Sequence, residues 1–328
     1  MTEATRRATQ TLWVNDPVFA THDTGEGHPE SIGRHVAVTR ALAAKEFQGG
    51  LWSIKPPASD DETISRAHKP RYVALVQREI QAGLGMLSTG DTILCKESLE
   101  AARRACGAVC LAVDEVVARR SANAFCTVRP PGHHATPDRG MGFCIFNNIA
   151  VAARHAQAQH KIQKVLIADF DVHHGNGTQD IFYDDPSVFF FSTHQSPWYP
   201  GTGAKQETGT GKGLGTTLNR PFPAGTGRAR IVPAYAEELR AAADKFRPEL
   251  VLVSAGFDSR LGDPLGHFRL TDDDFAELTD VLVDVANRHA EGRLVSVLEG
   301  GYNLEGLAAA SASHCRRLIH AAEQSVSD

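Results

Sequence analysis

Five short runs of apolar residues constrain the fold of this chain more than any other feature of its sequence. Several of them are too uniformly apolar for strands with one side in water, so we expect strands buried on both faces. Helical periodicity lies between most of the runs. Buried strands that alternate with helices indicate an α/β fold with a central, mainly parallel β-sheet and helices on both faces. The runs are residues 124–128, 165–168, 188–191, 250–253 and 294–298.

The remaining chain is predicted from the same periodicities and from its turn-forming residues. A first short strand is expected at residues 11–14. Residues 197–227 are rich in Gly, Thr and Pro and are expected to be mostly loop. Helices are expected at residues 31–47, 101–119, 146–159, 232–246 and 275–289.

Polar residues follow each of the five apolar runs directly. In an open α/β sheet, ligands bind at the carboxyl ends of the strands. The sequence therefore predicts an active site at the C-terminal ends of the strands, where five loops meet. These loops are 129–134 (RPPGHH), 169–178 (DFDVHHGNGT), 192–194 (STH), 254–258 (SAGFD) and 299–303 (EGGYN).

The loop after the second run carries two carboxylates and an imidazole at alternate positions. If the backbone stays extended, the side chains of Asp169, Asp171 and His173 point to the same face. With Asp258 from another loop, Asp171 and His173 make a ligand set that suits a divalent metal such as zinc and leaves one coordination position open. Oxygen ligands also suit Fe(II) or Mn(II), so these ions are alternatives.

The paired histidines His133 and His134 supply the base that a metal-activated water requires. Asp169 and Asn176 could accept hydrogen bonds that orient the two imidazoles. Tyr302 could donate its hydroxyl to an oxyanion. These groups together indicate metal-assisted hydrolysis of an amide. The sequence has no Gly-x-Ser-x-Gly motif, no Walker loop, and no Gly-x-Gly-x-x-Gly motif after a strand.

Composition limits the partners and the domain number. The 328 residues contain no Ser/Pro-rich or charged linker, so we expect one domain over residues 1–328 with a flexible segment at 1–10. A net charge of -5 without a basic block argues against nucleic-acid binding. No run of about 18 apolar residues occurs, and the N-terminus lacks the apolar stretch of a secretory signal. We therefore expect a cytoplasmic protein that does not enter membranes; the oligomeric state stays open.

Six motifs, in this order along the chain, resemble the zinc-dependent histone deacetylase superfamily, and most closely its class II branch. The similarity extends from His22 to about Leu318. It implies an arginase/deacetylase-like α/β fold. The motifs are residues 129–134 (RPPGHH), 142–144 (GFC), 169–179 (DFDVHHGNGTQ), 254–258 (SAGFD), 262–264 (GDP) and 299–303 (EGGYN).

The resemblance implies a role for each catalytic group. The zinc ligands would be Asp171, His173 and Asp258. His134 would be the general base and then the general acid, while His133 would act electrostatically beside its carboxylate. Tyr302 would polarise the substrate carbonyl. A structural potassium ion would be held by Asp169, Asp171, His173, Ser192 and Thr193.

The resemblance also implies an acyl-lysine channel. Its two aromatic walls match Phe143, which follows Gly142, and Tyr199. The second wall is often phenylalanine in the family, so the hydroxyl of Tyr199 makes the channel more polar. Asn176 stands where class I members have aspartate, so the protonated form of His134 should be less stabilised. Polyamine-selective relatives have an acidic residue where this chain has Leu265. The apolar Leu265 has no charge that would attract the second amine of a polyamine.

Three functions remain open from the sequence. The leading hypothesis is a zinc-dependent deacetylase that acts on acyl-lysine in peptides or proteins. The alternative is an amidohydrolase for acetylpolyamines or other small N-acyl amines. From a different class, the chain could be a catalytically silent acyl-lysine-binding scaffold, although every group that the chemistry needs is present.

Overall fold

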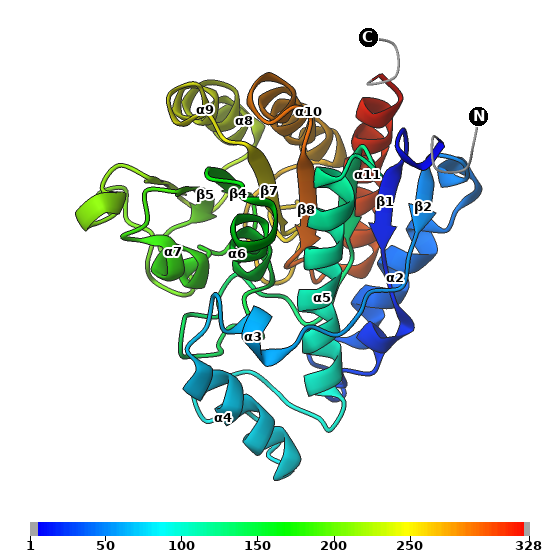
Figure 1. Cartoon of the computed structure of the whole chain (residues 1–328), viewed down its shortest axis with the longest axis vertical. Coiled ribbons are helices and arrows are strands. Elements are labelled where there is room, and N and C mark those ends of the chain that lie inside the picture. Colours follow the sequence, from blue (N-terminus) through cyan, green and yellow to red (C-terminus); the bar gives the residue numbers. More distant parts are fainter. Residues whose placement is uncertain (1–5, 325–328) are drawn as a thin grey trace.

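An eight-stranded, all-parallel β-sheet runs through the protein in the computed structural model, which describes residues 6–324 (Figure 1). The strand order is β2-β1-β3-β8-β7-β4-β5-β6. The six strands predicted from the sequence are the six inner ones, which confirms the α/β architecture. They are β1 (Thr11–Val14), β3 (Asn123–Cys126), β4 (Val165–Asp169), β5 (Val188–Gln195), β7 (Leu250–Ala255) and β8 (Leu294–Leu298).

The two edge strands are those that the sequence did not predict. They are β2 (Leu51–Ser53) and β6 (Thr217–Phe222). Prediction of 197–227 as mostly loop therefore missed β6. An edge strand has a single partner and partly exposed side chains, so β6 contains polar residues and Pro221 in place of a uniform apolar run. The apolar signature that marks the inner strands is absent from strands of this kind.

Each inner strand buries both of its faces, which explains its apolar composition. In β4, Val165 and Ile167 belong to one hydrophobic cluster, whereas Leu166 and Ala168 belong to a second cluster. Alternate residues of a strand point to opposite faces of the sheet. The sheet therefore separates two hydrophobic layers, each closed by helices.

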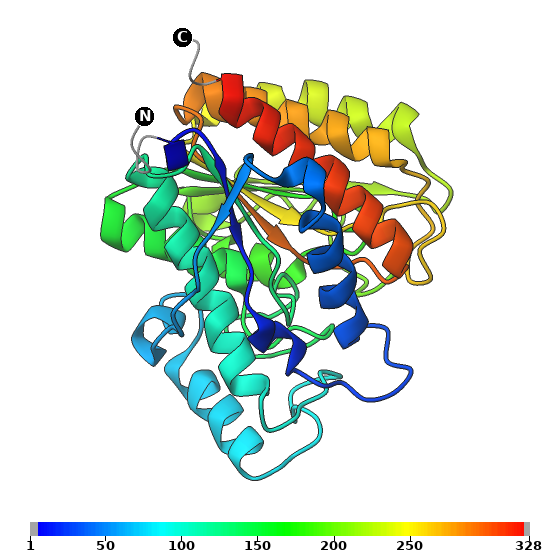
Figure 2. The same ribbon diagram turned by 90° about the vertical axis from the view of Figure 1, so that its right-hand side faces the viewer.

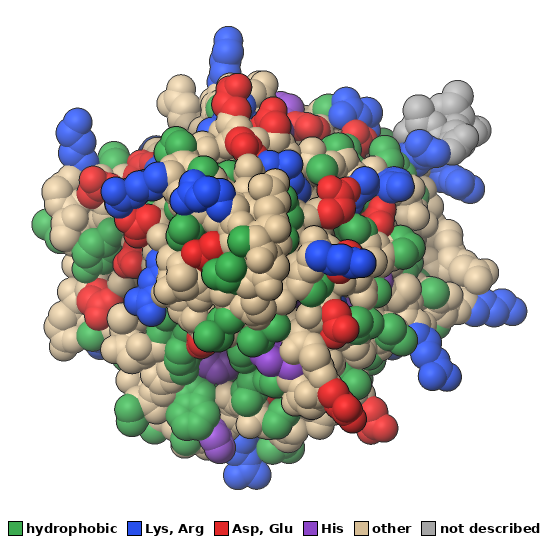
Figure 3. All heavy atoms as spheres, turned by 90° about the horizontal axis from the view of Figure 1, so that it is seen from below, with side chains coloured by type: hydrophobic (Ala, Val, Ile, Leu, Met, Phe, Trp, Pro, Cys, Tyr) green, Lys and Arg blue, Asp and Glu red, His purple; other side chains and the backbone are tan. Residues whose placement is uncertain are grey.

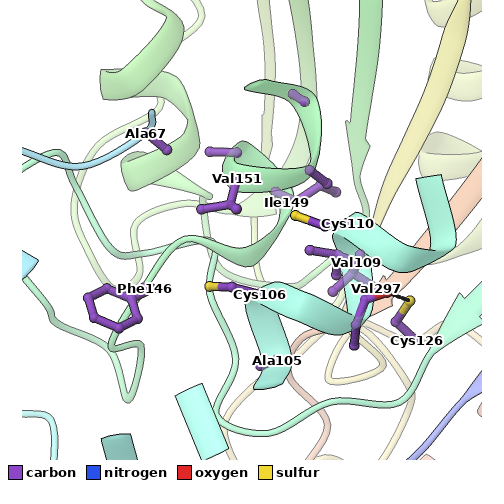
Figure 4. Close-up of a cluster of buried hydrophobic side chains, with 14 of the residues drawn as sticks. Ala67, Ala105, Cys106, Val109, Cys110, Cys126, Phe146, Ile149, Val151 and Val297 are labelled. Atoms are coloured by element: carbon purple, nitrogen blue, oxygen red, sulfur yellow. Dashed lines mark hydrogen bonds between the residues drawn. The ribbon is translucent and has the colours of Figure 1, made fainter. Parts of the chain in front are cut away.

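Helices cover both faces of the sheet (Figures 1 and 2). On one face lie α5 and α6, and on the other lie α2, α10, α11 and the segment from α8 to α9. Figure 4 shows Cys106 and Cys110 of α5 beside Ile149 and Val151 of α6 in the first of these layers. The helices are α2 (Ile32–Leu42), α3 (Asp61–Ile64), α4 (Pro70–Gln81), α5 (Ser98–Val117), α6 (Asn148–His160), α7 (Asn176–Phe182), α8 (Arg228–Pro233), α9 (Arg240–Phe246), α10 (Asp272–His289) and α11 (Leu304–Gln324).

Two of the five predicted helices differ from the prediction. The helix expected at 31–47 ends at Leu42, and a 3₁₀ turn, Lys45–Phe47, follows. The helix expected at 232–246 begins at Arg228 and is interrupted by a π-helical turn, Ala234–Leu239, directly after Pro233. Proline lacks the N–H that the regular helical ladder needs, which accounts for an irregularity at this position. Helices α3, α4, α7 and α11 were not predicted.

The N-terminal segment expected to be flexible is described in part. Residues 1–5 lie outside the described residues. The side chain of Gln10 donates a hydrogen bond of 2.5 Å to the carbonyl of Gly49, and the Arg7 guanidinium lies 4.9 Å from the centre of the Trp52 ring. None of the helices between residues 6 and 324 is both long and apolar enough to cross a membrane.

Candidate active site

The loops after the inner strands meet at one edge of the sheet, as the sequence predicted. Strand β4 ends at Asp169, and the chain then bends, so the extended backbone assumed for residues 169–173 is wrong. The bend still brings Asp171 and His173 together. The side chain of Asp169 instead points to His133, with 2.9 Å between its Oδ2 and Nδ1 of the imidazole.

Asp171, His173 and Asp258 form a compact, buried group whose candidate ligand atoms all lie within 4.8 Å of one another. Nδ1 of His173 is 3.0 Å from Oδ1 of Asp171 and 3.1 Å from Oδ2 of Asp258. Backbone N–H groups fix both carboxylates: that of Gly300 donates to Asp171 and that of Val172 to Asp258, each at 2.8 Å. Two oriented carboxylates and one imidazole fit a catalytic zinc ion.

The chain approaches this group closely at Gly300. A Cβ atom at this position would overlap the carboxylate oxygens of both Asp258 and Asp171. Any side chain here would displace the two carboxylates. The second residue of the EGGYN motif is therefore glycine because any larger residue would collide with the carboxylates of Asp171 and Asp258.

The histidine pair lies next to this group, and each imidazole has the partner that the sequence predicted. Nδ1 of His134 lies 2.8 Å from Oδ1 of Asn176, and the two histidine rings are 4.0 Å apart. Burial lowers the pKa of His134 well below its usual value, and the charges of His133 and His173 lower it further. Burial acts in the same direction on His133, but Asp171 and Asp169 outweigh it and raise the pKa of His133 well above its usual value. These opposite shifts favour the neutral form of His134 and the protonated form of His133.

Tyr302 faces the same space from the loop after β8. Its backbone N–H donates to Oδ2 of Asp263 at 2.7 Å, and the Arg34 guanidinium lies 5.0 Å from the centre of its ring. Burial raises the pKa of Tyr302 well above its usual value, against the opposing effect of Arg34. The phenol therefore stays protonated and is able to donate a hydrogen bond at neutral pH.

A cavity of about 210 Å³ leads to these groups, and its lining includes all four residues expected in the substrate channel. The Tyr199 ring stands at 89° to the His134 ring with 5.2 Å between centres, and the Phe143 and Tyr302 ring centres are 5.9 Å apart. Figure 3 shows this face of the molecule, where hydrophobic and histidine side chains gather. The lining consists of Asp91, His134, Gly142, Phe143, His173, Trp198, Tyr199, Leu265 and Tyr302.

The backbone at Gly142 is adapted to this cavity. Gly142 has a φ of +57°, and a Cβ atom there would overlap the His134 ring. Its N–H donates to Oδ1 of Asp91 at 2.7 Å. Glycine is thus required by both the left-handed backbone and the proximity of the catalytic imidazole.

Several residues of the site were missed by the sequence reasoning. Trp198 donates its indole N–H to the carbonyl of Leu265 at 2.8 Å and so joins two walls of the cavity. Beneath the site, the fully buried Arg34 donates to the carbonyls of Gly301, at 2.7 Å, and Glu299. The Glu299 carboxylate accepts the backbone N–H of His133 at 3.1 Å. Membership of the EGGYN motif was a signal that could have identified Glu299, whereas Arg34 lies close to none of the six motifs in sequence.

Arg129, the first residue of the RPPGHH motif, belongs to the same buried network. Its guanidinium forms an ion pair with Glu30, and Arg34 pairs with the same carboxylate at 2.9 Å. Burial tends to raise the pKa of Glu30, but the two arginines, Arg129 foremost, hold it below its usual value. An ionised carboxylate between two guanidinium groups fixes the loops that carry the histidine pair and Tyr302.

Comparison with known proteins identifies this architecture. The histone deacetylase domain family matches residues 28–318. The chain belongs to the histone deacetylase family. Members of this family are hydrolases of amide bonds and are in general zinc-dependent, so the chain is a deacetylase-type enzyme. The solved HDA15 HD domain is similar over 98% of this chain and 93% of its own, with a TM-score of 0.89 and 35% identity.

Relatives of this deacetylase come from plants, bacteria and animals. Histone deacetylase 10, chloroplastic, from Oryza sativa subsp. japonica is 41% identical over 90% of this chain and 70% of its own length. The histone deacetylase-like amidohydrolase of Pseudomonas aeruginosa is 38% identical over 89% and 75%. The human polyamine deacetylase HDAC10 is 39% identical over 92% of this chain and 45% of its own. One plant relative is thus named chloroplastic, and the cytoplasmic location expected for this chain stays a prediction.

Proposed function

We propose that this deacetylase removes acetyl groups from lysine side chains and holds zinc through Asp171, His173 and Asp258. One observation carries the proposal. A cavity with aromatic walls ends at a buried triad of metal-ligand type, beside a neutral imidazole and a protonated phenol. An extended side chain that ends in an amide fits this cavity, because its methylene groups can pack against the aromatic walls and its amide can reach the polar groups at the end.

We infer that the single domain extends over residues 1–328.

The two ring nitrogens of His134 have separate roles in the proposed reaction. When bound at the triad, a divalent ion supplies a Lewis acid for the carbonyl and lowers the pKa of the attacking water. Since Oδ1 of Asn176 accepts from Nδ1, the other nitrogen, Nε2, is free of its proton and accepts one from that water. The oxygen of that water bonds to the carbonyl carbon. Nε2 then gives the proton to the amine nitrogen as the C–N bond breaks, and the acetyl group leaves as acetate.

Tyr302 and His133 stabilise the charge that develops on the substrate carbonyl. The phenol of Tyr302 donates a hydrogen bond to the carbonyl oxygen, which is the role of an oxyanion-hole donor. His133 stays protonated beside Asp169 and contributes a fixed positive charge at the floor of the cavity. Neither residue has to exchange a proton during the cycle.

The expected potassium site remains part of the proposal. In the sheet, Ser192 is the register partner of Asp169. The Ser192 hydroxyl lies 3.0 Å from His194, and that of Thr193 lies 3.4 Å from the hydroxyl of Tyr235, which donates to the Asp169 carbonyl at 2.8 Å. A potassium ion near Asp169, Asp171, His173, Ser192 and Thr193 would therefore stabilise the end of β4, directly before the bend that carries the zinc ligands.

A second substrate class, acetylpolyamines, is favoured by one feature of the cavity. Asp91 lines it, and a carboxylate there could attract the second amine of a polyamine. Leu265 opposes this choice because it is apolar. We therefore rank acetyl-lysine first. A higher kcat/KM for acetylspermidine than for an acetyl-lysine peptide would reverse the ranking.

The decisive experiment measures acetate release by zinc-loaded protein from acetyl-lysine peptides. We expect turnover by the wild type, and in Asp258→Asn the loss of turnover together with the zinc ion held by Asp171, His173 and Asp258. A protein that binds the peptide with stoichiometric zinc but releases no acetate from any acylated amine would instead be an acyl-lysine-binding scaffold. Folding of the variant is checked by circular dichroism.

A further inference from the structure

A second group of metal-ligand type lies far from the active site. It consists of Asp114 on α5 and His155 and His160 on α6, whose candidate ligand atoms lie within 4.8 Å of one another. His160 is the last residue of α6 and Asp114 lies in the last turn of α5. Helix α6 begins beside the RPPGHH loop, where Asn148 donates to the Pro130 carbonyl at 3.1 Å. Its 13 residues span about 20 Å, so its end lies at the opposite edge of the sheet.

The two imidazoles converge on one oxygen atom. Nε2 of His155 lies 2.7 Å and Nε2 of His160 lies 2.6 Å from Oδ1 of Asp114. The ring centres are 5.9 Å apart at an angle of 69°. All three side chains are partly accessible, with exposed fractions of 12% for His155, 22% for His160 and 36% for Asp114. Solvent therefore reaches part of each of the three side chains.

We propose that Asp114, His155 and His160 form a second metal site, which binds a borderline divalent cation such as zinc. Two imidazoles and one carboxylate are a ligand set for such ions. Metal–ligand distances of about 2.0–2.1 Å in a tetrahedron place the ligand atoms about 3.3 Å apart. The group must therefore open by about 0.6 Å to admit the ion. In the catalytic triad, Nδ1 of His173 lies 3.0 and 3.1 Å from the two carboxylate oxygens, so a smaller opening admits an ion there.

The surroundings of this group favour a bound cation. Both helices direct their C-terminal ends toward it, and such ends carry partial negative charge. Of the cations nearest in sequence, Arg119 pairs with Glu291 and Arg154 with Asp185, each at 2.5 Å. Lys161, which follows His160, is exposed. Water would complete the coordination because the side chains are partly exposed.

The proposed ion would join the ends of two helices that are already packed together. Buried residues of α5 and α6 share one hydrophobic cluster, part of which Figure 4 shows. This packing fixes the backbones that carry the three ligands. Strand β4 begins at Val165, five residues after His160. The ion would therefore stabilise the entry to the strand that leads to the catalytic triad, without taking part in the reaction.

Hydrogen bonds alone could also join the three side chains, and one substitution distinguishes the two arrangements. In His160→Gln, the amide can still donate to Asp114 but is a poor zinc ligand. We expect wild-type protein, dialysed against buffered zinc, to hold two equivalents and His160→Gln to hold one. Deacetylase activity should be unchanged in the variant because the catalytic triad is intact, and this also shows that the variant is folded.

Two further variants make the experiment specific. His289 pairs with Asp244 at 2.8 Å as a single imidazole on a single carboxylate, so His289→Gln should keep both equivalents. Asp258→Asn should lose the catalytic equivalent and keep the other. The same remaining site, loaded with Co²⁺ in place of zinc, should show the visible absorption of a low-coordinate ion. One equivalent in the wild type, or two in His160→Gln, would overturn the proposal.

Discussion

The substitution Asn176→Asp tests how the protein keeps His134 ready to accept a proton. Oδ1 of Asn176 lies 2.8 Å from Nδ1 of His134, so a carboxylate in its place would contact the imidazole directly. An added negative charge favours the protonated imidazole and therefore raises the pKa of His134. The wild-type pKa is held well below its usual value by burial and by the two neighbouring histidines.

The size of the effect follows from Coulomb's law. With about 4 Å between charge centres and an effective dielectric constant of about 20, the interaction is about 4 kcal/mol. At 1.36 kcal/mol for each pKa unit, this value corresponds to about 3 units as an upper limit. Since neighbouring charges shift pKa values by about 1–3 units in proteins, we expect a rise within that range. A base with a raised pKa is protonated over a wider pH range and is inactive there.

The assay is the pH profile of kcat/KM on an acetyl-lysine peptide, because its acid limb reports the base of the free enzyme. We expect this limb to move to higher pH by about 1–3 units in Asn176→Asp, with activity recovered on the alkaline side. Gln179→Glu is the matched control: Gln179 lies on the same helix, but its Oε1 faces His174 at 3.1 Å. An unmoved acid limb in Asn176→Asp, or an equal shift in the control, would refute the reasoning.

Three further substitutions test other parts of the site. In Tyr302→Phe, kcat should fall roughly 10²-fold or more with unchanged zinc content, and an unchanged kcat would exclude the hydroxyl from the mechanism. In Leu265→Glu, one added charge pair should raise kcat/KM for acetylspermidine relative to that for an acetyl-lysine peptide by roughly tenfold, measured by competition assays. An unaltered ratio would show that residue 265 does not contribute to substrate selectivity. Gly142→Ala should lower kcat/KM by about tenfold or more, because the left-handed backbone adds strain of about 1–2 kcal/mol and the new methyl group displaces His134. In the control Gly25→Ala, φ is also positive, at +88°, but no atom lies within 4 Å of the new methyl group, so kcat/KM should be unchanged.

The sequence predicted the inner part of the fold better than its edges. The six inner strands were recognisable because burial on both faces requires apolar residues at successive positions, as in Val165 and Leu166. Strands β2 and β6 have no such requirement and were missed. Helix α11 was also missed, although its buried residues Leu307, Ala310, Cys315 and Leu318 recur at helical spacing. A weak local pattern therefore explains the missed edge strands, whereas α4 and α11 were missed despite a recognisable apolar periodicity.

The sequence by itself predicted which chemical groups share the candidate site of this protein. Polar groups after parallel strands must share one edge of the sheet, and this rule alone brought Asp171, His173 and Asp258 together with the histidine pair. Only the tertiary structure decided the contacts between segments distant in the chain, such as Arg34 beneath Tyr302. It also decided that Asp114 meets two histidines of another helix. Local periodicity reports which face of an element is buried, whereas such pairs depend on how whole elements pack.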